Sequence, residues 1–172
     1  MKRIRHLIYI VLLLVFDQLT KYLVLTNLKG KDSFQIIPGV LQLHYHENTG
    51  AVWGIMSGQT GLLVAFSVLI MIGMIFVYFK IPMDKRYDLM RIILIFIAAG
   101  ALGNFIDRIT RKYVVDFIYF ELIDFPIFNV ADCYITISTF LLILLSLFYY
   151  KDEDFSFLNK KEKTVENGSK DE

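Results

Sequence analysis

Four long apolar stretches, separated by charged or polar segments, dominate the pattern of this chain of 172 residues. A helix needs about 20 predominantly apolar residues to cross about 30 Å of hydrocarbon, and each stretch is long enough. The pattern therefore predicts a polytopic α-helical membrane protein. Its four transmembrane helices are expected near Leu7–Thr26, Leu62–Ile81, Leu89–Ile109 and Val130–Tyr150.

The first apolar stretch admits a second interpretation. Met1-Lys2-Arg3-Ile4-Arg5 followed by apolar residues is typical of the start of a secretory signal peptide. No small-residue cleavage site follows, and the helical pattern continues through Asp17-Gln18-Leu19-Thr20-Lys21. We therefore expect a retained transmembrane helix rather than a cleaved leader.

The distribution of Lys and Arg predicts the orientation of the helices. In a layout with both termini on one side, twelve of the 18 basic residues lie on that side. The other side holds Lys21, Lys29, Lys31, Arg108, Arg111 and Lys112. Because loops rich in Lys and Arg stay in the cytoplasm, we expect both termini there, with the segments at about 27–61 and 110–129 outside.

Both outer segments contain runs typical of strands rather than helices. Phe34–Ile37, Val40–His46 and Tyr113–Phe120 are rich in β-branched and aromatic residues or alternate apolar with polar side chains. We expect them to form a small extracytoplasmic β-sheet. Its aromatic and aliphatic face would rest at the membrane surface, where Trp53 would also lie.

The alternation around His44 favours a strand face over a metal site. The packed face of this strand would hold Leu41, Leu43 and Tyr45. The side chains on its solvated face would be Gln42, His44 and His46. A zinc site with Glu47 is the alternative, but zinc normally takes three or four ligands and no further candidate is apparent. We therefore expect no metal site.

Composition narrows the class of protein further. Hydrophobic residues make up 56% of the chain, with 15 Phe and 10 Tyr, which is more than a soluble domain of this length carries. A net charge of +1 gives no sign of a nucleic-acid partner, and we expect no cofactor. The single cysteine, Cys133, excludes an internal disulfide, and its apolar helix predicts a buried thiol.

Polar residues inside the predicted helices recur at helical spacing. Asp17 and Lys21 are four apart, so they share a face and can form an ion pair. In the third helix, the residues that recur at steps of three and four are Gly100, Gly103, Asn104 and Asp107. They predict a groove of small residues that ends in two polar groups. Simple helix packing by the glycines, and a structural ion pair for Asp17, are the alternatives at this point.

Several polar residues converge near the outer ends of the helices or in the outer segments. They are Asp17, Asn48, Asn104, Asp107, Arg108, Asp116, Asn129 and Asp132. Asp107 has Arg108 beside it and Asn104 one turn back, so its charge has local partners. Asp116 and Asp132 have mostly apolar neighbours and belong to different elements, as two groups that act on one reacting centre do.

Two such carboxyl groups predict the chemistry of an aspartic protease. When they meet within a few ångströms they share one proton, because both cannot easily ionise. The ionised member takes a proton from water, which attacks the peptide carbonyl, while the protonated member donates to the carbonyl oxygen. One alternative is a small proton- or ion-coupled transporter with a relay of acids, and another is a noncatalytic scaffold. Against the transporter, the acids gather on one side and the span Leu62–Phe79 carries no charge.

Five sequence blocks carry a specific resemblance to a known family. The blocks are Asp17-Gln18-Leu19-Thr20-Lys21, Asn48-Thr49-Gly50-Ala51-Val52-Trp53-Gly54, Gly100-Ala101-Leu102-Gly103-Asn104-Phe105-Ile106-Asp107-Arg108, Val114-Val115-Asp116-Phe117-Ile118 and Pro126-Ile127-Phe128-Asn129-Val130-Ala131-Asp132. Through them, and up to about Tyr150, the chain resembles the lipoprotein signal peptidases, also called signal peptidase II.

The resemblance implies an aspartyl endopeptidase of the bacterial cytoplasmic membrane. Such an enzyme removes signal peptides from diacylglyceryl-modified prolipoproteins, cutting before the lipidated cysteine. The resemblance assigns the catalytic pair to Asp116 and Asp132. The residues that it implies order the site or bind substrate are Asp17, Lys21, Asn48, Gly50, Gly103, Asn104, Asp107, Arg108 and Asn129. Partners would be lipid-modified prolipoproteins and membrane lipid, with no nucleic acid and the protein a monomer.

Some positions depart from the family pattern. Residues 1–150 are expected to form a single four-helix peptidase domain, whereas 151–172 are highly charged and expected to be a disordered cytoplasmic tail. Trp53 stands where the family often has Phe. Cys133 follows the second aspartate where a small residue is usual. These two changes are expected to alter the fit of the substrate.

Overall fold

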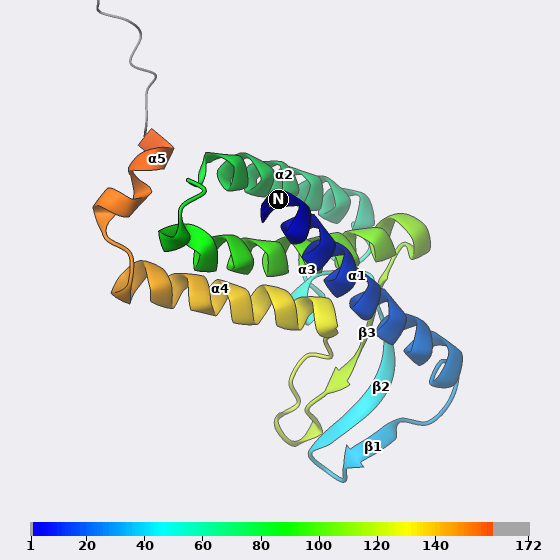
Figure 1. Ribbon diagram of the computed structural model, residues 1–172. Coiled ribbons are helices and arrows are strands. Elements are labelled where there is room, and N and C mark those ends of the chain that lie inside the picture. Colours follow the sequence, from blue (N-terminus) through cyan, green and yellow to red (C-terminus); the bar gives the residue numbers. More distant parts are fainter. Residues whose placement is uncertain (1, 160–172) are drawn as a thin grey trace, which may run out of the picture.

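The computed structural model describes residues 2–159 and contains the predicted bundle of long helices (Figure 1). The helices are α1 (Lys2–Asn27), α2 (Thr60–Lys80), α3 (Asp88–Arg111) and α4 (Val130–Phe148). All four are long and apolar enough to cross a membrane, which confirms the predicted spans. The main difference lies in α1, which begins five residues earlier than its apolar stretch because its basic residues also favour a helix.

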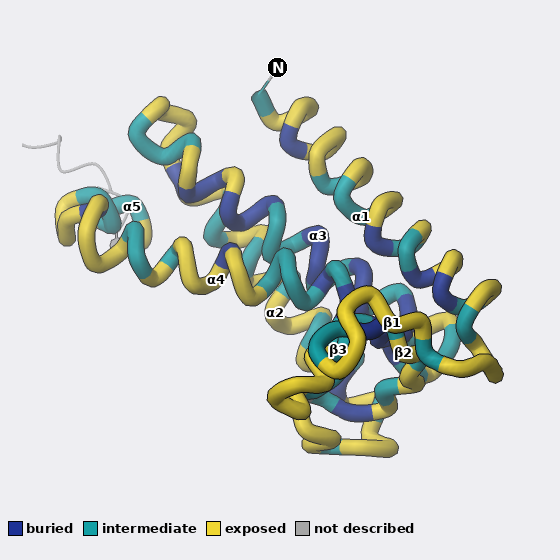
Figure 2. The backbone as a smooth tube through the Cα atoms, turned by 90° about the horizontal axis from the view of Figure 1, so that it is seen from below, coloured by how far each residue is buried: buried dark blue, intermediate teal, exposed yellow. Residues whose placement is uncertain are grey.

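The central helix of the bundle is α3, which packs against the other three. Buried positions gather along it and where it meets the sheet (Figure 2). Gly100 allows α4 to approach closely, since a Cβ at this position would lie 2.5 Å from the carbonyl oxygen of Ala131. In contrast, α2 buries only Leu63 and exposes apolar side chains along its length. Such faces suit contact with lipid, where the helix satisfies its own backbone polar groups.

A three-stranded antiparallel sheet lies at the end of the bundle where α1 and α3 end and α4 begins (Figure 1). Its strands are β1 (Phe34–Ile37), β2 (Leu41–Asn48) and β3 (Val114–Tyr119), in the order β1-β2-β3. The predicted strands are confirmed to within two residues at their ends. In the pairing of β2 with β3, His46 lies opposite Asp116.

Two predictions of exposure are wrong at single residues. Gln42 is buried rather than solvated, although His44 and His46 are exposed as expected. The reason is that β2 is the central strand and its register with β3 shifts between Leu43 and His46, so one alternation does not run through the whole strand. Cys133 is half-buried, since it lies in the first turn of α4 beside the sheet end of the bundle.

The predicted disordered tail is wrong for residues 152–159. These residues form a 3₁₀ turn (Asp152–Phe155) and the short helix α5 (Ser156–Asn159). The turn is held by Arg86, whose Nη2 lies 2.7 Å from Asp154 Oδ2, and by a cluster of aromatic rings. The charge of Asp154 is therefore paired with Arg86, and Phe155 packs against a buried apolar cluster. The rest of the predicted tail lies outside the described residues.

Candidate active site

A buried cluster of ions joins α1 to α3 at the sheet end of the bundle. Lys21 Nζ lies 3.0 Å from Asp17 Oδ2 and 3.2 Å from Asp107 Oδ2, and all three side chains are fully buried. The predicted pair of Asp17 with Lys21 is therefore confirmed, and Asp107 joins it. A second cation, Arg111, forms an ion pair with Asp107 from one turn further along α3. Two acids and two bases balance one another in this cluster.

The ion pairs of Asp107 are with Lys21 and Arg111 and not with the adjacent Arg108. Adjacent residues on a helix do not face each other, whereas Arg111 at the i+4 position shares the face of Asp107. Arg108 instead donates from Nη2 to the carbonyl oxygen of Gly50 at 3.1 Å. The backbone N–H of Gly50 donates to Asn48 Oδ1 at 2.9 Å. Arg108 thus anchors the loop that follows β2.

The ion cluster also holds the two elements that carry Asp116 and Asp132. Asp17 Oδ1 accepts the backbone N–H of Ala131 at 3.0 Å, in the first turn of α4. Asp107 Oδ2 accepts the N–H of Val115 at 3.2 Å, next to Asp116 in β3. Helix α1 can lie this close because residue 103 is glycine: a Cβ there would lie 2.5 Å from Asp17 Oδ2. Asp17, Asp107 and Gly103 therefore position the site without forming its surface.

Asn104 connects the ion cluster to Asp132. Its Oδ1 accepts a hydrogen bond from Lys21 Nζ at 2.9 Å, and its Nδ2 donates to Asp132 Oδ1 at 2.7 Å. An ammonium group can only donate, so the oxygen of the Asn104 amide must face Lys21. The amide nitrogen is thereby directed at the carboxyl group of Asp132. The buried charge of Lys21 thus fixes the orientation of the Asn104 amide, and through it the hydrogen bond to Asp132.

Asn129 bonds to both carboxyl groups. It caps α4 with a capping box, in which Asn129 Oδ1 accepts the N–H of Asp132 and Asp132 Oδ2 accepts the N–H of Asn129, each at 3.1 Å. Because its oxygen is occupied by the cap, its Nδ2 faces away and donates to Asp116 Oδ1 at 2.6 Å. The second oxygen of Asp116 accepts from Asn48 Nδ2 at 2.8 Å. The predicted site residues of β2, β3, α3 and the start of α4 thus meet in one network.

The two carboxyl groups differ in exposure. Asp116 is 1% exposed, whereas Asp132 is half-buried and keeps an open side. Burial, followed by the negative charge of Asp132, raises the pKa of Asp116 to about 7, although the amides of Asn48 and Asn129 act in the opposite direction. Near neutral pH this pair therefore holds a proton that an ordinary carboxyl group would have lost.

Sequence reasoning missed several contributors to this network. Gln18 Nε2 donates to Asp17 Oδ2 at 3.1 Å and to the carbonyl oxygen of Gly103 at 3.3 Å. The helical spacing of polar residues did not identify Gln18, because its neighbour Asp17 lies on the buried face of α1. Arg111 was readable from its i+4 spacing to Asp107. The capping box was likewise readable from the Asn129-x-x-Asp132 spacing, because Asn is a favoured N-cap residue.

The His, Cys, Asp and Glu side chains are the groups that could bind a metal ion in the described part of the chain. Within residues 2–159, no three or more His, Cys, Asp or Glu side chains converge on one point. His44 Nδ1 instead lies 2.7 Å from the hydroxyl of Ser33 on the exposed side of the sheet. The site itself presents two carboxyl groups and the side-chain amides that donate to them.

Comparison with known proteins identifies the family. The profile of the family described as "Signal peptidase (SPase) II" matches residues 9–148. The chain belongs to the signal peptidase II family. It is therefore a peptidase of the lipoprotein-processing, aspartic type, and the comparisons give no support to the transporter interpretation.

Individual relatives cover nearly the whole chain. It is 43% identical over 158 residues to the lipoprotein signal peptidases of Staphylococcus aureus strains JH9 and Newman, covering 90% of this chain and 91% of each relative. A bacterial membrane enzyme solved by the in meso method at 2.3 Å resolution shares 39% identity and a TM-score of 0.72, with 94% of each chain covered. A second such structure, at 1.9 Å resolution, shares 38% identity and a TM-score of 0.73, covering 85% of this chain and 94% of that one. The four-helix fold with its small sheet is thus that of a signal peptidase II.

Proposed function

We propose that Asp116 and Asp132 are the catalytic pair of this signal peptidase II. The observation that carries the proposal is their joint attachment to Asn129, which donates its side-chain amide to one carboxyl group and its backbone N–H to the other. Two acids from different elements, held by one residue and fixed by further amides, form the arrangement that a shared proton requires. The substrate is a prolipoprotein whose cysteine carries a diacylglyceryl group, cut on the N-terminal side of that cysteine.

The pair hydrolyses the peptide bond with one water molecule. The ionised carboxyl group takes a proton from the water, whose oxygen forms a bond to the carbonyl carbon, while the protonated carboxyl group donates its proton to the carbonyl oxygen. The tetrahedral intermediate then collapses. The C–N bond breaks, the leaving nitrogen receives a proton from the pair, and the carboxyl group of the signal peptide is released. The half-buried side of Asp132 is where water and substrate meet the pair.

The surrounding residues keep the pair in position, and the positive charge of Arg108 on α3 acts on both carboxyl groups. Asn48 and Asn104 each donate to one carboxyl oxygen, so the remaining lone pairs of Asp116 and Asp132 point to the reacting groups. The ion cluster behind them holds α4 and β3 in place with balanced charges. An unbalanced cation there would lower the pKa of the pair and remove the proton that the reaction needs.

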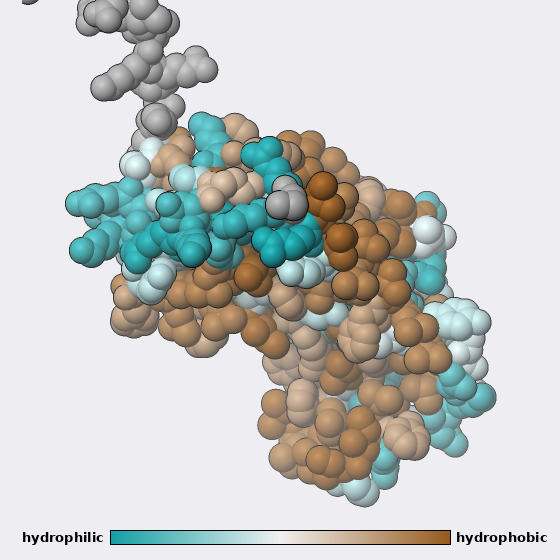
Figure 3. Space-filling model, in the orientation of Figure 1, coloured by the Kyte–Doolittle hydropathy of each residue, from teal (hydrophilic) through white to brown (hydrophobic). Residues whose placement is uncertain are grey.

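The setting of the site suits a substrate anchored in lipid. The tip of the sheet exposes apolar side chains from β1 and from the turn after β3, and forms the brown surface at the bottom of Figure 3. The exposed large apolar residues of β1 and of this turn include Phe34, Ile36, Ile37, Leu122 and Ile123. We infer that this patch contacts the outer membrane surface and the lipidated segment of the substrate. The site then lies near the extracytoplasmic face of the bacterial cytoplasmic membrane, with both termini in the cytoplasm and the enzyme acting as a monomer.

The test is cleavage by variants that neutralise one acid each. The wild type, Asp116→Asn, Asp132→Asn and Asp124→Asn are purified in the same lipid, checked for equal folding, and given a prolipoprotein with or without its diacylglyceryl group. Asp124 is the matched control, because it lies in the same outer segment and, among residues 2–159, its carboxyl group accepts a hydrogen bond from the Tyr119 hydroxyl alone, at 2.6 Å. General acid–base catalysis is worth about 10²–10⁴-fold, so each catalytic variant is expected to lose at least that much.

The outcomes separate the assignments. Loss of cleavage in both catalytic variants, with Asp124→Asn active on the lipidated substrate alone, supports the proposal. Near-normal turnover by Asp116→Asn or Asp132→Asn shows that the pair is wrongly assigned, and makes Asp107 the next residue to test. Equal cleavage of the unlipidated protein shows that the diacylglyceryl group is not part of recognition.

A further inference from the structure

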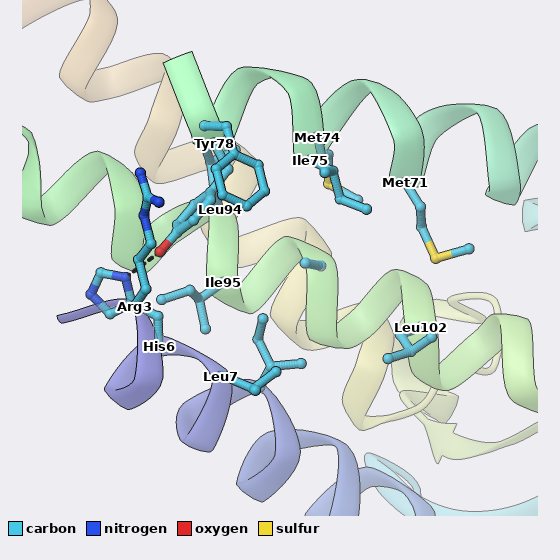
Figure 4. Close-up of a pocket in the computed structure, with 13 residues that line it drawn as sticks. Arg3, His6, Leu7, Met71, Met74, Ile75, Tyr78, Leu94, Ile95 and Leu102 are labelled. Carbon is cyan, nitrogen blue, oxygen red and sulfur yellow. Dashed lines mark hydrogen bonds between the residues drawn. The ribbon is translucent and has the colours of Figure 1, made fainter. Parts of the chain in front are cut away.

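A groove in the bundle has none of the residues of the carboxyl network in its lining. It has a volume of about 500 Å³ and runs between α1 and α2 over the surface of α3 (Figure 4). Its walls are apolar along most of their length, with Leu7, Met71, Met74, Ile75, Ile95 and Leu102 among the lining residues. The volume falls within the range of ligand sites, about 300–1,000 Å³. Flexible methionines in the lining adapt readily to an irregular hydrocarbon chain.

One end of the groove is polar and carries a cation. His6 Nδ1 lies 2.6 Å from the hydroxyl of Tyr78, which joins α1 to α2 at this end (Figure 4). Arg3 lines the groove here and places its guanidinium over the ring of Phe79, 5.0 Å from the centroid. Within residues 2–159, Arg3 forms no ion pair, whereas the neighbouring Lys2 is paired with Asp88 at 3.1 Å. The groove therefore combines an apolar body with one positive charge that has no ion pair in the described residues, in the first turn of a helix long and apolar enough to cross a membrane.

We propose that this groove binds an anionic phospholipid of the surrounding membrane, with one acyl chain between α1 and α2 and the phosphate at Arg3. The positive charge of Arg3 matches the negative phosphate, and the apolar lining matches the acyl chain. A guanidinium forms paired hydrogen bonds with phosphate oxygens, and its position at the end of a hydrophobic helix is that of a lipid headgroup. The acyl chain then covers the faces of α1, α2 and α3 that line the groove.

Charge also decides against two other occupants. A signal peptide begins with a basic segment, which would lie at the same end as Arg3 and be repelled by it. A second copy of this chain would bring its own Lys2, Arg3 and Arg5 to the same end if it packed in parallel. An anionic headgroup instead gains from Arg3 and from the exposed Lys80 on the last turn of α2.

The test is photocrosslinking of defined lipids to the full-length protein in nanodiscs. The probe is phosphatidylglycerol with a diazirine near the end of one acyl chain, compared with phosphatidylcholine carrying the same chain. Crosslinked residues are identified by peptide mass spectrometry. We expect labelling of the Met71 and Leu102 region, about fivefold stronger for phosphatidylglycerol, which corresponds to about 1 kcal/mol for one basic residue near an anionic lipid.

Four variants make the test specific. Arg3→Gln is expected to lower phosphatidylglycerol labelling to the phosphatidylcholine level, and Arg3→Lys to restore most of it. Arg5→Gln is the matched control, because Arg5 is exposed on the same helix end but does not line the groove. Ala98→Phe fills the groove and is expected to abolish labelling of Met71 while peptidase activity and size-exclusion profile stay normal.

The results that would overturn the proposal are equally specific. Equal labelling by the two lipids, or no change in Arg3→Gln, shows that the groove does not select an anionic headgroup. Displacement of the probe by the basic end of a prolipoprotein signal peptide, or crosslinks between two copies of the chain, assigns the groove to one of those occupants instead.

Discussion

The raised pKa of Asp116 makes the stability of the folded protein depend on pH in a defined direction. Burial and the charge of Asp132 raise this pKa from its ordinary 3.8 to about 7. Between these values the folded protein keeps a proton that the unfolded chain has lost. Raising the pH across this window removes that proton against the buried environment, so the free energy of unfolding falls as the pH rises from about 4 to about 8.

The size of this effect follows from the shift. One pKa unit is worth about 1.4 kcal/mol, so a pKa raised from 3.8 to about 7 corresponds to a loss of stability on the order of a few kcal/mol across the window. Asp116→Asn is expected to remove this part of the slope. The variant also places an NH₂ group against one of the amide donors that now bond to Asp116, which costs about 1–3 kcal/mol at every pH. The informative quantity is therefore the slope and not the stability at one pH.

The assay is unfolding in detergent, followed by helical signal, at pH values from 4 to 8. Wild type and Asp124→Asn are expected to share one slope, and Asp116→Asn to be flatter than both. Asp132→Asn is expected to reduce the slope without abolishing it, because the charge of Asp132 is one cause of the raised pKa and burial is the first. Equal slopes for Asp116→Asn and the wild type would refute the reasoning, since no proton would then be held by Asp116.

Three further predictions concern the positioning residues. Gly103→Ala drives a Cβ into Asp17 and is expected to destabilise the protein by about 1–3 kcal/mol in detergent unfolding, whereas Gly73→Ala, which meets nothing within 4 Å, is expected to be neutral or slightly stabilising. Lys21→Met leaves two buried acids without their shared cation and is expected to cost about 3–5 kcal/mol, whereas Lys29→Met breaks an exposed pair and is expected to change stability far less. Asn129→Ser keeps a cap for α4 but loses the amide that lowers the pKa of Asp116; we expect near-normal folding, slower cleavage and an alkaline limb of the pH–rate profile shifted upward. An unshifted limb in Asn129→Ser, or equal costs within either matched pair, would count against these assignments.

The features that the sequence predicted well are those set by local pattern. Apolar length fixed the spans to within a few residues, because hydrocarbon thickness dictates helix length. Runs of β-branched, aromatic or alternating residues located β1, β2 and β3, because successive side chains of a strand point to opposite faces of the sheet. Spacing of four residues found the pair of Asp17 with Lys21. Each of these depends on residues that are neighbours in the chain.

The features that the sequence predicted poorly depend on contacts between distant segments. The burial of Gln42 follows from a register shift between two strands, and the contact of Arg108 with Gly50 joins α3 to a loop 58 residues away. Residues 152–159 looked like a solvated charged tail because the partner of Asp154 is Arg86, far earlier in the chain. That Lys21 orients the amide of Asn104, and through it the contact with Asp132, likewise became visible only when α1, α3 and α4 were placed together.

The shared proton of Asp116 and Asp132 is the centre of this account, and the pH dependence of kcat/KM tests it most directly. Cleavage of a diacylglyceryl-modified prolipoprotein is measured from pH 4 to pH 10, with folding checked at each pH. A profile that falls on the alkaline side with an apparent pKa near 7 is the predicted result, because the pair then loses the proton that it must donate. A rate that stays constant up to pH 10 would contradict the shared-proton mechanism.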